Sequence, residues 1–220
     1  MDTLKQISYW LDTFGMFSHD IPSAYAIWKE GNKALKVGHT KEAERYERLN
    51  YLLHNSSIPS SCKLGENVQF AYGGIGVILH QNCVIGDGVV IGSNVTVGGK
   101  AGATSRYVTP KGRKTSLPVI DDYAYIATGA KILGAVRVGT LAIIGANAVV
   151  VSDVPPLTVA AGIPAKAIKK IIPANCVQFK STFLPLRSLP DNDFIRLIEN
   201  IAQGADTDSH SPVSSYEELQ

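Results

Sequence analysis

One histidine departs from a regular pattern of six-residue repeats (hexads). Of the five histidines, only His80 lies among the hexads, directly after an aliphatic residue, Leu79. Other hexads carry a small residue there, such as Gly86 and Gly92, and a local exception marks a candidate functional residue. An imidazole titrates at about pH 6.5 and accepts a proton from a hydroxyl group near neutral pH. His80 is therefore a candidate general base, the alternative being a surface imidazole on the wall of the fold.

A second candidate feature is a basic stretch. No acidic residue lies between Asp87 and Asp121, whereas this interval holds five basic ones. Clustered positive charge suits an anionic ligand, such as the phosphates of coenzyme A or an acidic sugar polymer, and the alternative is a solvated loop. Tyrosine, proline and glycine within the stretch favour a lid over a disordered tether. The predicted substrate or lid residues are Tyr72, Lys100, Arg106, Lys111 and Arg113.

Small residues follow several of the aliphatic anchors. They occur at Gly98-Gly99, at Ala127-Thr-Gly-Ala and at Gly145-Ala146. Such residues leave backbone amides open to a long, thin ligand such as a pantetheine arm. They also suit the corners of a coil, and both roles are compatible.

The repeat itself predicts the fold that positions these residues. Aliphatic anchors recur every six residues from Leu79 to Val97 and again from Ile120 to Ile144. This period fits neither a helix nor an alternating strand, and it indicates a parallel β-solenoid with three short faces per turn. The step from Phe70 to Leu79 is nine residues, and the step from Val97 to Ile120 is 23. The second interruption predicts an extruded loop over residues 103–118.

Helical segments are expected on both sides of the solenoid. Residues 1–56 form a predicted helical segment that caps the open end of the coil, because they combine apolar and charged faces at helical spacing. The solenoid domain is predicted over residues 57–173. Residues 174–220 form a C-terminal extension with a short helix from Asp191 to residue 203, Asp191 being the N-cap, and a mobile tail.

Composition narrows the class of protein. The 220 residues carry a formal net charge of +2 and are 45% hydrophobic, which fits a globular domain and argues against a general nucleic-acid binder. The three cysteines match no zinc pattern and are expected to be reduced core residues. We find no signal peptide and no apolar run of about 18 residues. We therefore predict a soluble, cytoplasmic protein.

The hexads over residues 58–172 resemble those of the hexapeptide-repeat acyltransferases. Three segments look like the serine acetyltransferase branch: Val95-Thr-Val-Gly-Gly-Lys, Ala127-Thr-Gly-Ala-Lys-Ile-Leu-Gly, and the stretch from Val154 that ends in Gly-Ile-Pro-Ala-Lys. The resemblance implies a mainly β fold, a left-handed parallel β-helix, usually assembled as a homotrimer that binds acetyl-CoA in clefts between subunits. It also implies that Gly98, Gly99, Thr128 and Ala146 line the acetyl-CoA cleft, with Lys166 near the phosphates.

Two departures from that branch shape the predicted acceptor. In register with the Asp-His-Ala-Thr-Gly segment of serine acetyltransferases, this chain has Tyr72-Gly-Gly-Ile-Gly, so Gly73 replaces a histidine, and Leu117 replaces a second one. The segment around His80 is instead similar to that of sugar and polysaccharide O-acetyltransferases, in which the histidine is the general base. The resemblance therefore predicts acetylation of a sugar hydroxyl in a capsular, O-antigen or other surface polysaccharide, or in its precursor.

The predicted mechanism is direct transfer. His80 deprotonates the hydroxyl, the hydroxyl attacks the acetyl-CoA thioester, and amides near Gly98 and Gly99 stabilise the oxyanion without a metal or an acyl-enzyme. The alternatives are a serine O-acetyltransferase and an amino-sugar N-acetyltransferase. A β-helical carbonic anhydrase, which needs three histidines on zinc, and a non-catalytic scaffold complete the set.

Overall fold

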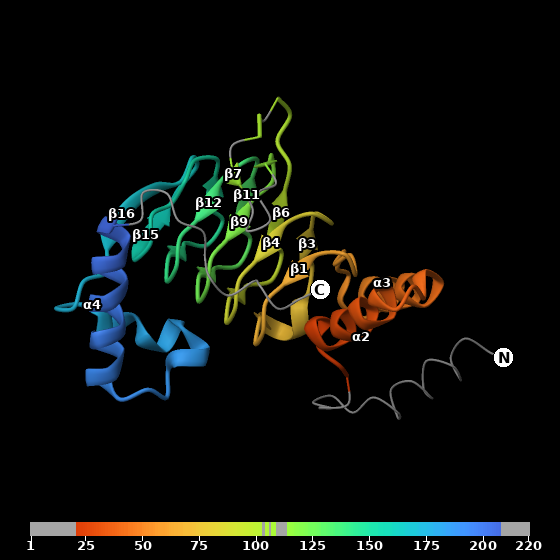
Figure 1. Cartoon of the computed structure of the whole chain (residues 1–220), viewed down its shortest axis with the longest axis horizontal. Coiled ribbons are helices and arrows are strands. Elements are labelled where there is room, and N and C mark those ends of the chain that lie inside the picture. Colours follow the sequence, from red (N-terminus) through yellow and green to blue (C-terminus); the bar gives the residue numbers. More distant parts are fainter. Residues whose placement is uncertain (1–20, 103, 106, 109–113, 208–220) are drawn as a thin grey trace.

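The computed structural model describes residues 21–102, 104–105, 107–108 and 114–207. Within them, short strands follow one another cyclically through three sheets, so the chain winds as a coil with three faces. Figure 1 shows this coil between two helices at one end and a third helix at the other. The N-terminal helical pattern before Ile21 and the predicted mobile tail lie outside the described residues.

Each sheet contains one strand from every turn of the coil. Sheet 1 contains β1 (Lys63–Leu64), β4 (Val84–Ile85), β9 (Val119–Ile120) and β12 (Arg137–Val138). Sheet 2 contains β2 (Gln69–Phe70), β5 (Val90–Ile91), β10 (Tyr125–Ile126), β13 (Ile143–Ile144), β15 (Thr158–Ala161) and β16 (Lys166–Lys170). Sheet 3 contains β3 (Ile78–Leu79), β6 (Thr96–Gly98), β11 (Lys131–Leu133) and β14 (Val149–Val150). All these pairings are parallel except that of β15 with β16.

The hexad anchors form the core of the coil, as the sequence predicts. Ile85, Ile91, Ile120, Ile126 and Ile132 are completely buried, and each lies in register with an anchor of the next turn. Their neighbours in each strand point outward, because successive strand residues face opposite sides. A second buried row lies two residues before the anchors, as at Val89, Ala124 and Ala130, so each face and turn contributes one large and one smaller side chain to this narrow interior.

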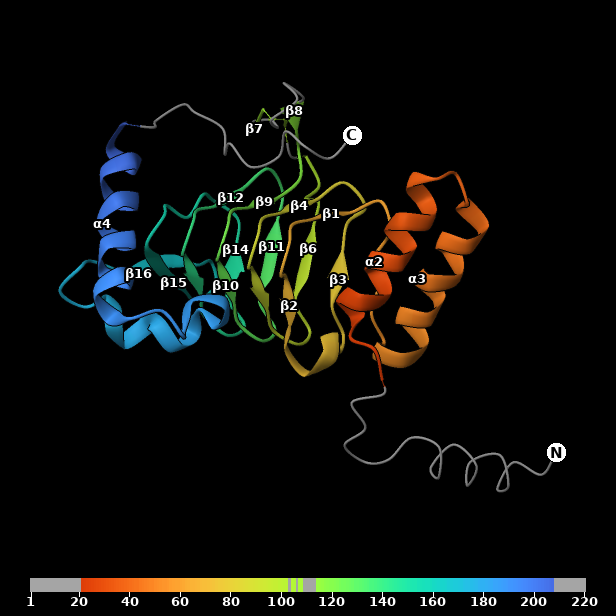
Figure 2. The ribbon, with the colours of Figure 1, turned by 60° about the horizontal axis from the view of Figure 1, so that its bottom comes forward.

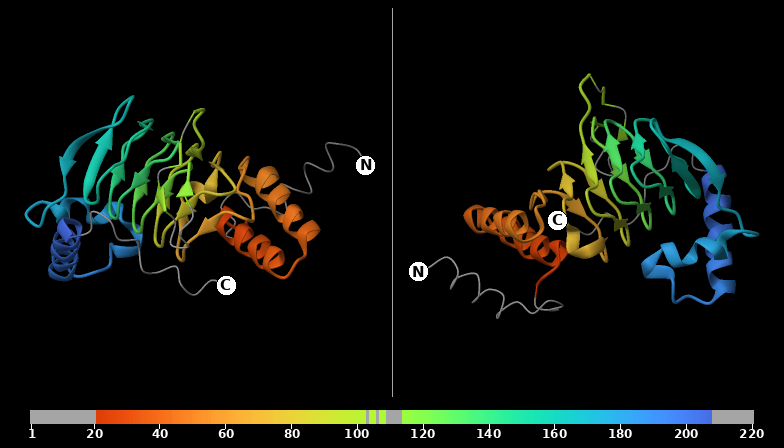
Figure 3. Two further views of the ribbon diagram at one scale, coloured as in Figure 1. Left: turned by 45° about the horizontal axis from the view of Figure 1, so that its top comes forward. Right: turned by 180° about the vertical axis from the view of Figure 1, so that it is seen from behind.

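Two helices close the start of the coil. Helix α2 (Ala24–Lys36) begins after Ser23, whose side chain accepts the Ala26 N–H, and α3 (Thr40–His54) runs beside it. Figures 2 and 3 show the pair at the end of the coil that carries β1 to β3. Trp28 and Ala24 belong to the same buried cluster as the first hexad anchors. The expected helical character is thus confirmed for the described part of the N-terminal segment.

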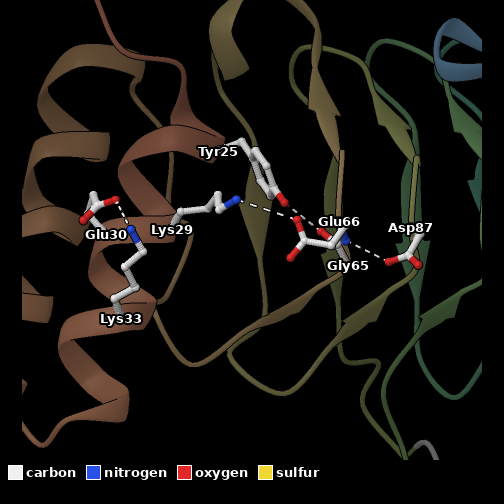
Figure 4. Close-up of polar contacts among 7 residues, drawn as sticks. All are labelled: Tyr25, Lys29, Glu30, Lys33, Gly65, Glu66 and Asp87. Atoms are coloured by element: carbon white, nitrogen blue, oxygen red, sulfur yellow. Dashed lines mark hydrogen bonds and ion pairs between the residues drawn. The ribbon is translucent and has the colours of Figure 1, made fainter. Parts of the chain in front are cut away.

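Polar contacts fix α2 to the first corner of the coil (Figure 4). The Tyr25 hydroxyl donates to the Gly65 carbonyl over 2.9 Å, and Lys29 pairs with Glu66 at 3.6 Å. The Glu66 N–H donates to the Asp87 carboxylate over 2.7 Å, which links the first corner to that of the next turn. Burial, followed by the charge of Glu66, raises the pKa of Tyr25 to about 12.

Both interruptions of the repeat are visible in the structure. The first forms a short 3-10 turn, η1 (Ala71–Gly74), between β2 and β3. The second contains an antiparallel pair, β7 (Tyr107–Val108) and β8 (Lys114–Thr115), so the predicted extruded loop includes a hairpin. This hairpin projects from the coil between β6 and β9 in Figure 1.

The C-terminal extension covers the outer side of sheet 2. It consists of η2 (Cys176–Thr182), η3 (Leu184–Leu186) and α4 (Asp191–Thr207), which is longer than the predicted helix. Phe183, Phe194 and Ile198 are completely buried in a second cluster with outward residues of the last turns. Asp191 was predicted to be the N-cap of this helix, but its carboxylate pairs with Lys180. The N–H groups of Asp193 and Phe194 donate to the Pro190 carbonyl and not to the Asp191 side chain. The described residues contain no helix long and apolar enough to cross a membrane.

Candidate active site

The outer side of sheet 3 carries the predicted base and the first glycines. Leu79 pairs with Val97, so His80 and Gly98 are next to each other at the end of their strands. The His80 N–H donates to the Val97 carbonyl over 2.8 Å, which fixes this register. Parallel strands lie about 4.8 Å apart, so the two residues are direct neighbours on one edge of the sheet. We call this edge, defined by His80, Gly98 and Gly99, the glycine edge.

The His80 ring is held by a backbone amide. Its Nδ1 accepts the Asn82 N–H at 3.2 Å, so in the neutral ring the proton resides on Nε2. The side chain is exposed. In this state His80 can donate a hydrogen bond through Nε2, but its basic nitrogen is already engaged. The geometry therefore suits a hydrogen-bond donor better than the predicted general base.

Gly98 and Gly99 have free space around them. A Cβ atom on Gly98 would meet no atom within 4 Å, and one on Gly99 would lie 3.5 Å from Leu117 Cδ2. By contrast, a Cβ atom on Gly92, one hexad earlier, would lie 2.4 Å from the Thr128 nitrogen. Packing within the described chain explains a glycine at position 92 but not at position 98. The open space beside Gly98 can receive a ligand or a neighbouring subunit.

The other predicted acetyl-CoA residues lie elsewhere. Thr128 and Ala146 are exposed in the turns that lead into β11 and β14, where the Asn147 N–H donates to the Thr128 carbonyl. These turns form the opposite edge of sheet 3, roughly 15 Å from the glycine edge at the strand rise of an extended chain. We call it the turn edge. Lys166 is exposed at the start of β16, opposite Ala161.

The predicted lid residues are only partly described. Tyr72 lies in η1 on the turn edge and is 79% exposed. Lys100 is exposed just after the glycine edge. Arg106, Lys111 and Arg113 lie outside the described residues.

A groove next to sheet 3 adds residues that the sequence did not indicate. It has a volume of about 310 Å³ and is lined by Tyr51, Asn55, Ser57, Gly76, Ile78, Asn94, Thr96 and Lys131. The Lys131 ammonium donates to the Asn94 carbonyl over 2.7 Å. The groove lining contains one cation and no carboxylate. Helix α3 contributes part of the wall, and no repeat in the sequence indicates that contribution.

A second imidazole, His54, also lies at the turn edge. It ends α3 and is buried, with Nε2 2.9 Å from the Pro22 carbonyl oxygen. Its other flank faces Gly73, where a Cβ atom would lie 3.2 Å from Cε1 and 3.5 Å from Nδ1 of the ring. His54 lies outside the hexads, and no role was predicted for it. Only the fold brings residues 54 and 73 together.

One buried carboxylate at the end of β9 has an altered acidity. Asp121 follows the anchor Ile120, is 3% exposed and accepts a hydrogen bond from Arg137 Nε over 2.7 Å. Burial raises the pKa of Asp121 to about 6, although Arg137 opposes the shift.

The described residues include no group of three or more histidine, cysteine or acidic side chains arranged to hold a metal ion. The three cysteines are free and buried.

Comparison with known proteins identifies the family. No family model matches the chain. A serine acetyltransferase of Staphylococcus epidermidis is 32% identical over 148 residues, 66% of this chain and 65% of the relative. One of Staphylococcus aureus is 31% identical over 169 residues, 76% of this chain and 72% of the relative. The chain thus spans about two thirds of the length of these relatives.

Solved structures show the same architecture. Serine acetyltransferase of Neisseria gonorrhoeae aligns with a TM-score of 0.58 at 27% identity, covering 68% of this chain and 53% of that one. The Brucella abortus enzyme in complex with coenzyme A gives a TM-score of 0.59 at 26% identity, covering 67% and 55%. Fold and relatives place the chain in the hexapeptide-repeat acyltransferase superfamily. Within this superfamily it belongs to the serine acetyltransferase family.

The family corrects the predicted acceptor. The prediction that a hydroxyl of a capsular or other polysaccharide is the acceptor is wrong. The two relatives that match over 148 and 169 residues are serine acetyltransferases. The error arose from the absence of histidines at Gly73 and Leu117. A missing side chain at one position does not define the acceptor, since a residue from another segment can lie beside the gap, as His54 does beside Gly73. The predicted enzyme class, an acyltransferase, agrees with the family.

Proposed function

We propose that this chain transfers the acetyl group of acetyl-CoA to the hydroxyl group of serine. The observation that carries this proposal is the 31% identity to the Staphylococcus aureus serine acetyltransferase over 169 residues. Neighbouring structures include a serine acetyltransferase in complex with coenzyme A and one in complex with serine, which supports both substrates. The left-handed winding and the homotrimer implied by the resemblance are part of the proposal.

The reaction requires a base and an oxyanion site. The serine oxygen attacks the thioester carbon, the C–S bond breaks, and O-acetylserine and coenzyme A leave. The Nε2–H of His80 and the amides near Gly98 and Gly99 lie on one edge and supply donors for the tetrahedral oxyanion. Thr128, Ala146 and Lys166 are proposed to bind the cofactor, Lys166 by attraction to its phosphates.

A trimer would join the two edges of sheet 3. A cyclic assembly contacts its neighbours through two different patches on each subunit. The glycine edge of one subunit can then face the turn edge of the next, which would bring Gly98 of one copy toward Thr128 of another. Sedimentation velocity measures the assembly, and a monomer at working concentration would contradict this part of the proposal.

Release of free thiol from acetyl-CoA tests the function. We expect thiol release with L-serine and none with L-alanine, which lacks the hydroxyl. His80→Ala removes the ring N–H and should reduce kcat about 10²- to 10³-fold, the usual loss for one oxyanion donor. His39→Ala is the matched control, because His39 is exposed in the turn before α3. The proposal fails if serine does not stimulate thiol release while a sugar or an amino sugar does.

A further inference from the structure

We infer that His54 is the general base of the transfer, accepting the proton of the acceptor hydroxyl at Nδ1. The inference rests on the proposed function and adds the residue that the reaction still lacks. His54 and His80 each have one hydrogen bond between the ring and the backbone, but it involves Nε2 of His54 and Nδ1 of His80. At His80 the basic nitrogen is engaged by the Asn82 N–H, whereas at His54 the protonated nitrogen is engaged by a carbonyl.

The hydrogen bond to Pro22 determines where the His54 proton lies. A carbonyl oxygen only accepts, so Nε2 must carry the hydrogen and Nδ1 the lone pair. Among the described residues, the buried side-chain nitrogens and oxygens that lack a partner are Trp28 Nε1 and Asn50 Oδ1. His54 Nδ1 is not one of these atoms, and no hydrogen bond joins it to another of the described residues, so Nδ1 keeps some accessible surface although the residue as a whole is only 6% exposed. A ring oriented by a carbonyl, with a free lone pair on its other nitrogen, has the arrangement of a general base.

The backbone around His54 is fixed. The Gly76 N–H donates to the His54 carbonyl over 2.9 Å, and the Ser56 hydroxyl lies between this carbonyl, at 3.2 Å, and the closer carbonyl of Gly74. These bonds connect the end of α3 to the turn edge. The ring therefore keeps its place beside Gly73 without a hydrogen bond at Nδ1.

The turn beside the ring leaves room for an acceptor. A Cβ atom at Gly73 would lie 3.5 Å from Nδ1. A hydroxyl oxygen of the acetyl acceptor at that position would be close to hydrogen-bond distance from Nδ1. Tyr72 and Gly73 both have left-handed backbone conformations, with φ of 53° and 75°. Tyr123 and Leu141 have the same conformation in other turns of the coil, with φ of 57° and 55°, so at Tyr72 it reflects the geometry of the turn. The Tyr72 ring is exposed at the rim, where it can cover a bound acceptor.

His54 and the oxyanion donors must come from different subunits. Gly76 and His80 are four residue steps apart along the chain, a span of roughly 13 Å for an extended chain, which exceeds the size of the reacting groups. In the proposed trimer, the turn edge of one copy faces the glycine edge of the next. His54 of one copy then takes the hydroxyl proton and returns it to the coenzyme A thiolate as the C–S bond of the neighbour's acetyl-CoA breaks.

Matched variants test the base directly. His54→Gln retains an N–H for the Pro22 carbonyl and removes the basic lone pair, and we expect kcat with serine to fall about 10²- to 10⁴-fold. Gly73→Ala should also reduce kcat, because its methyl group would lie against the ring. Its control is Gly38→Ala, since Gly38 also has a positive φ (83°) but open space at its Cβ position. Wild-type kcat in His54→Gln, or equal kcat in the two glycine variants, would overturn the inference.

Chemical rescue distinguishes a base from a structural residue. Adding imidazole to His54→Ala should restore part of kcat but leave the thermal midpoint unchanged. Co-expression of His54→Gln with His80→Ala should restore roughly a quarter of the sites if each site combines both edges of neighbouring copies. No rescue and no complementation would refute a base contributed between subunits.

One measurement is independent of the acceptor. Nitrogen NMR of the folded wild-type protein should show His54 with the hydrogen on Nε2 and a free lone pair on Nδ1. If wild type ignores serine but shows this tautomer, the proposed function fails and the orientation of the base stands. If the hydrogen is on Nδ1, the inference on His54 fails whatever the acceptor is.

Discussion

Gly92 and Gly98 allow one chemical change to be compared at equivalent positions. Each directly follows a buried anchor, Ile91 and Val97. A Cβ atom on Gly92 would lie 2.4 Å from the Thr128 nitrogen and 2.8 Å from the Ala127 carbonyl carbon, but one on Gly98 would meet no atom within 4 Å. Neither glycine has a positive φ. Replacement by alanine therefore tests the close approach between turns of the coil and little else.

The contacts set the expected magnitudes. At Gly92 the obstructing atoms are backbone and cannot move without weakening the 2.7 Å hydrogen bond from the Gly92 N–H to the Ile126 carbonyl. Overpacking costs about 1–3 kcal/mol and a weakened hydrogen bond about 1 kcal/mol, so Gly92→Ala should lose about 3 kcal/mol. Gly98→Ala should be neutral or more stable by about 0.4–1 kcal/mol, because alanine restricts the unfolded chain.

Urea unfolding of both variants at equal protein concentration checks this difference. We expect similar slopes and a lower midpoint for Gly92→Ala alone. Gly98→Ala should fold normally yet have a raised KM for acetyl-CoA, because its methyl group enters the space proposed for the cofactor. Equal losses of stability in the two variants, or a neutral Gly92→Ala, would show that contact between turns is not what requires glycine.

Two further predictions concern charge and the helical cap. Burial raises the pKa of Asp121 from 3.8 to about 6. Between about pH 4 and pH 6 the native state therefore binds more protons than the unfolded chain. The free energy of unfolding should fall by about 3 kcal/mol as the pH rises through this interval. Asp121→Asn should flatten this dependence in urea midpoints, and an unchanged slope would contradict the assignment. Tyr25→Phe removes the hydrogen bond to the Gly65 carbonyl and should cost about 1 kcal/mol, with faster hydrogen exchange in α2 but not in α4. Unaltered exchange in α2 would show that Tyr25 does not hold this helix.

The sequence predicts most of the coil because the hexad anchors lie in one interior row per face. Ile85, Ile120 and Val138 are 35 and 18 residues apart, yet they stack in one sheet. The period therefore specified register as well as fold. It also located both interruptions, since any extra residue must leave the row. It could not show that the second interruption contains a paired hairpin, which depends on contacts between β7 and β8.

The site was less predictable than the fold, because a residue that departs from the hexad pattern does not always have a functional role. Asp121 occupies the same hexad position as His80, and both break the pattern of small residues. In the structure the Asp121 side chain is buried against Arg137, whereas His80 is exposed on the glycine edge. A broken pattern therefore identifies a position that is special without showing whether its role is structural or chemical. Burial and partners decide this, and both follow from tertiary packing.

The wrong acceptor has the same physical origin as the overlooked histidine. An alignment compares side chains at equal positions along the coil, and in that comparison Gly73 replaces a histidine of the serine acetyltransferases. Helix α3, however, places the His54 ring where it flanks the empty side of Gly73. The glycine and the histidine fit together, because a Cβ atom at position 73 would lie 3.2 Å from Cε1 of the ring, which is a tight contact. What a repeat lacks at one position has to be judged from the three-dimensional surroundings of that position.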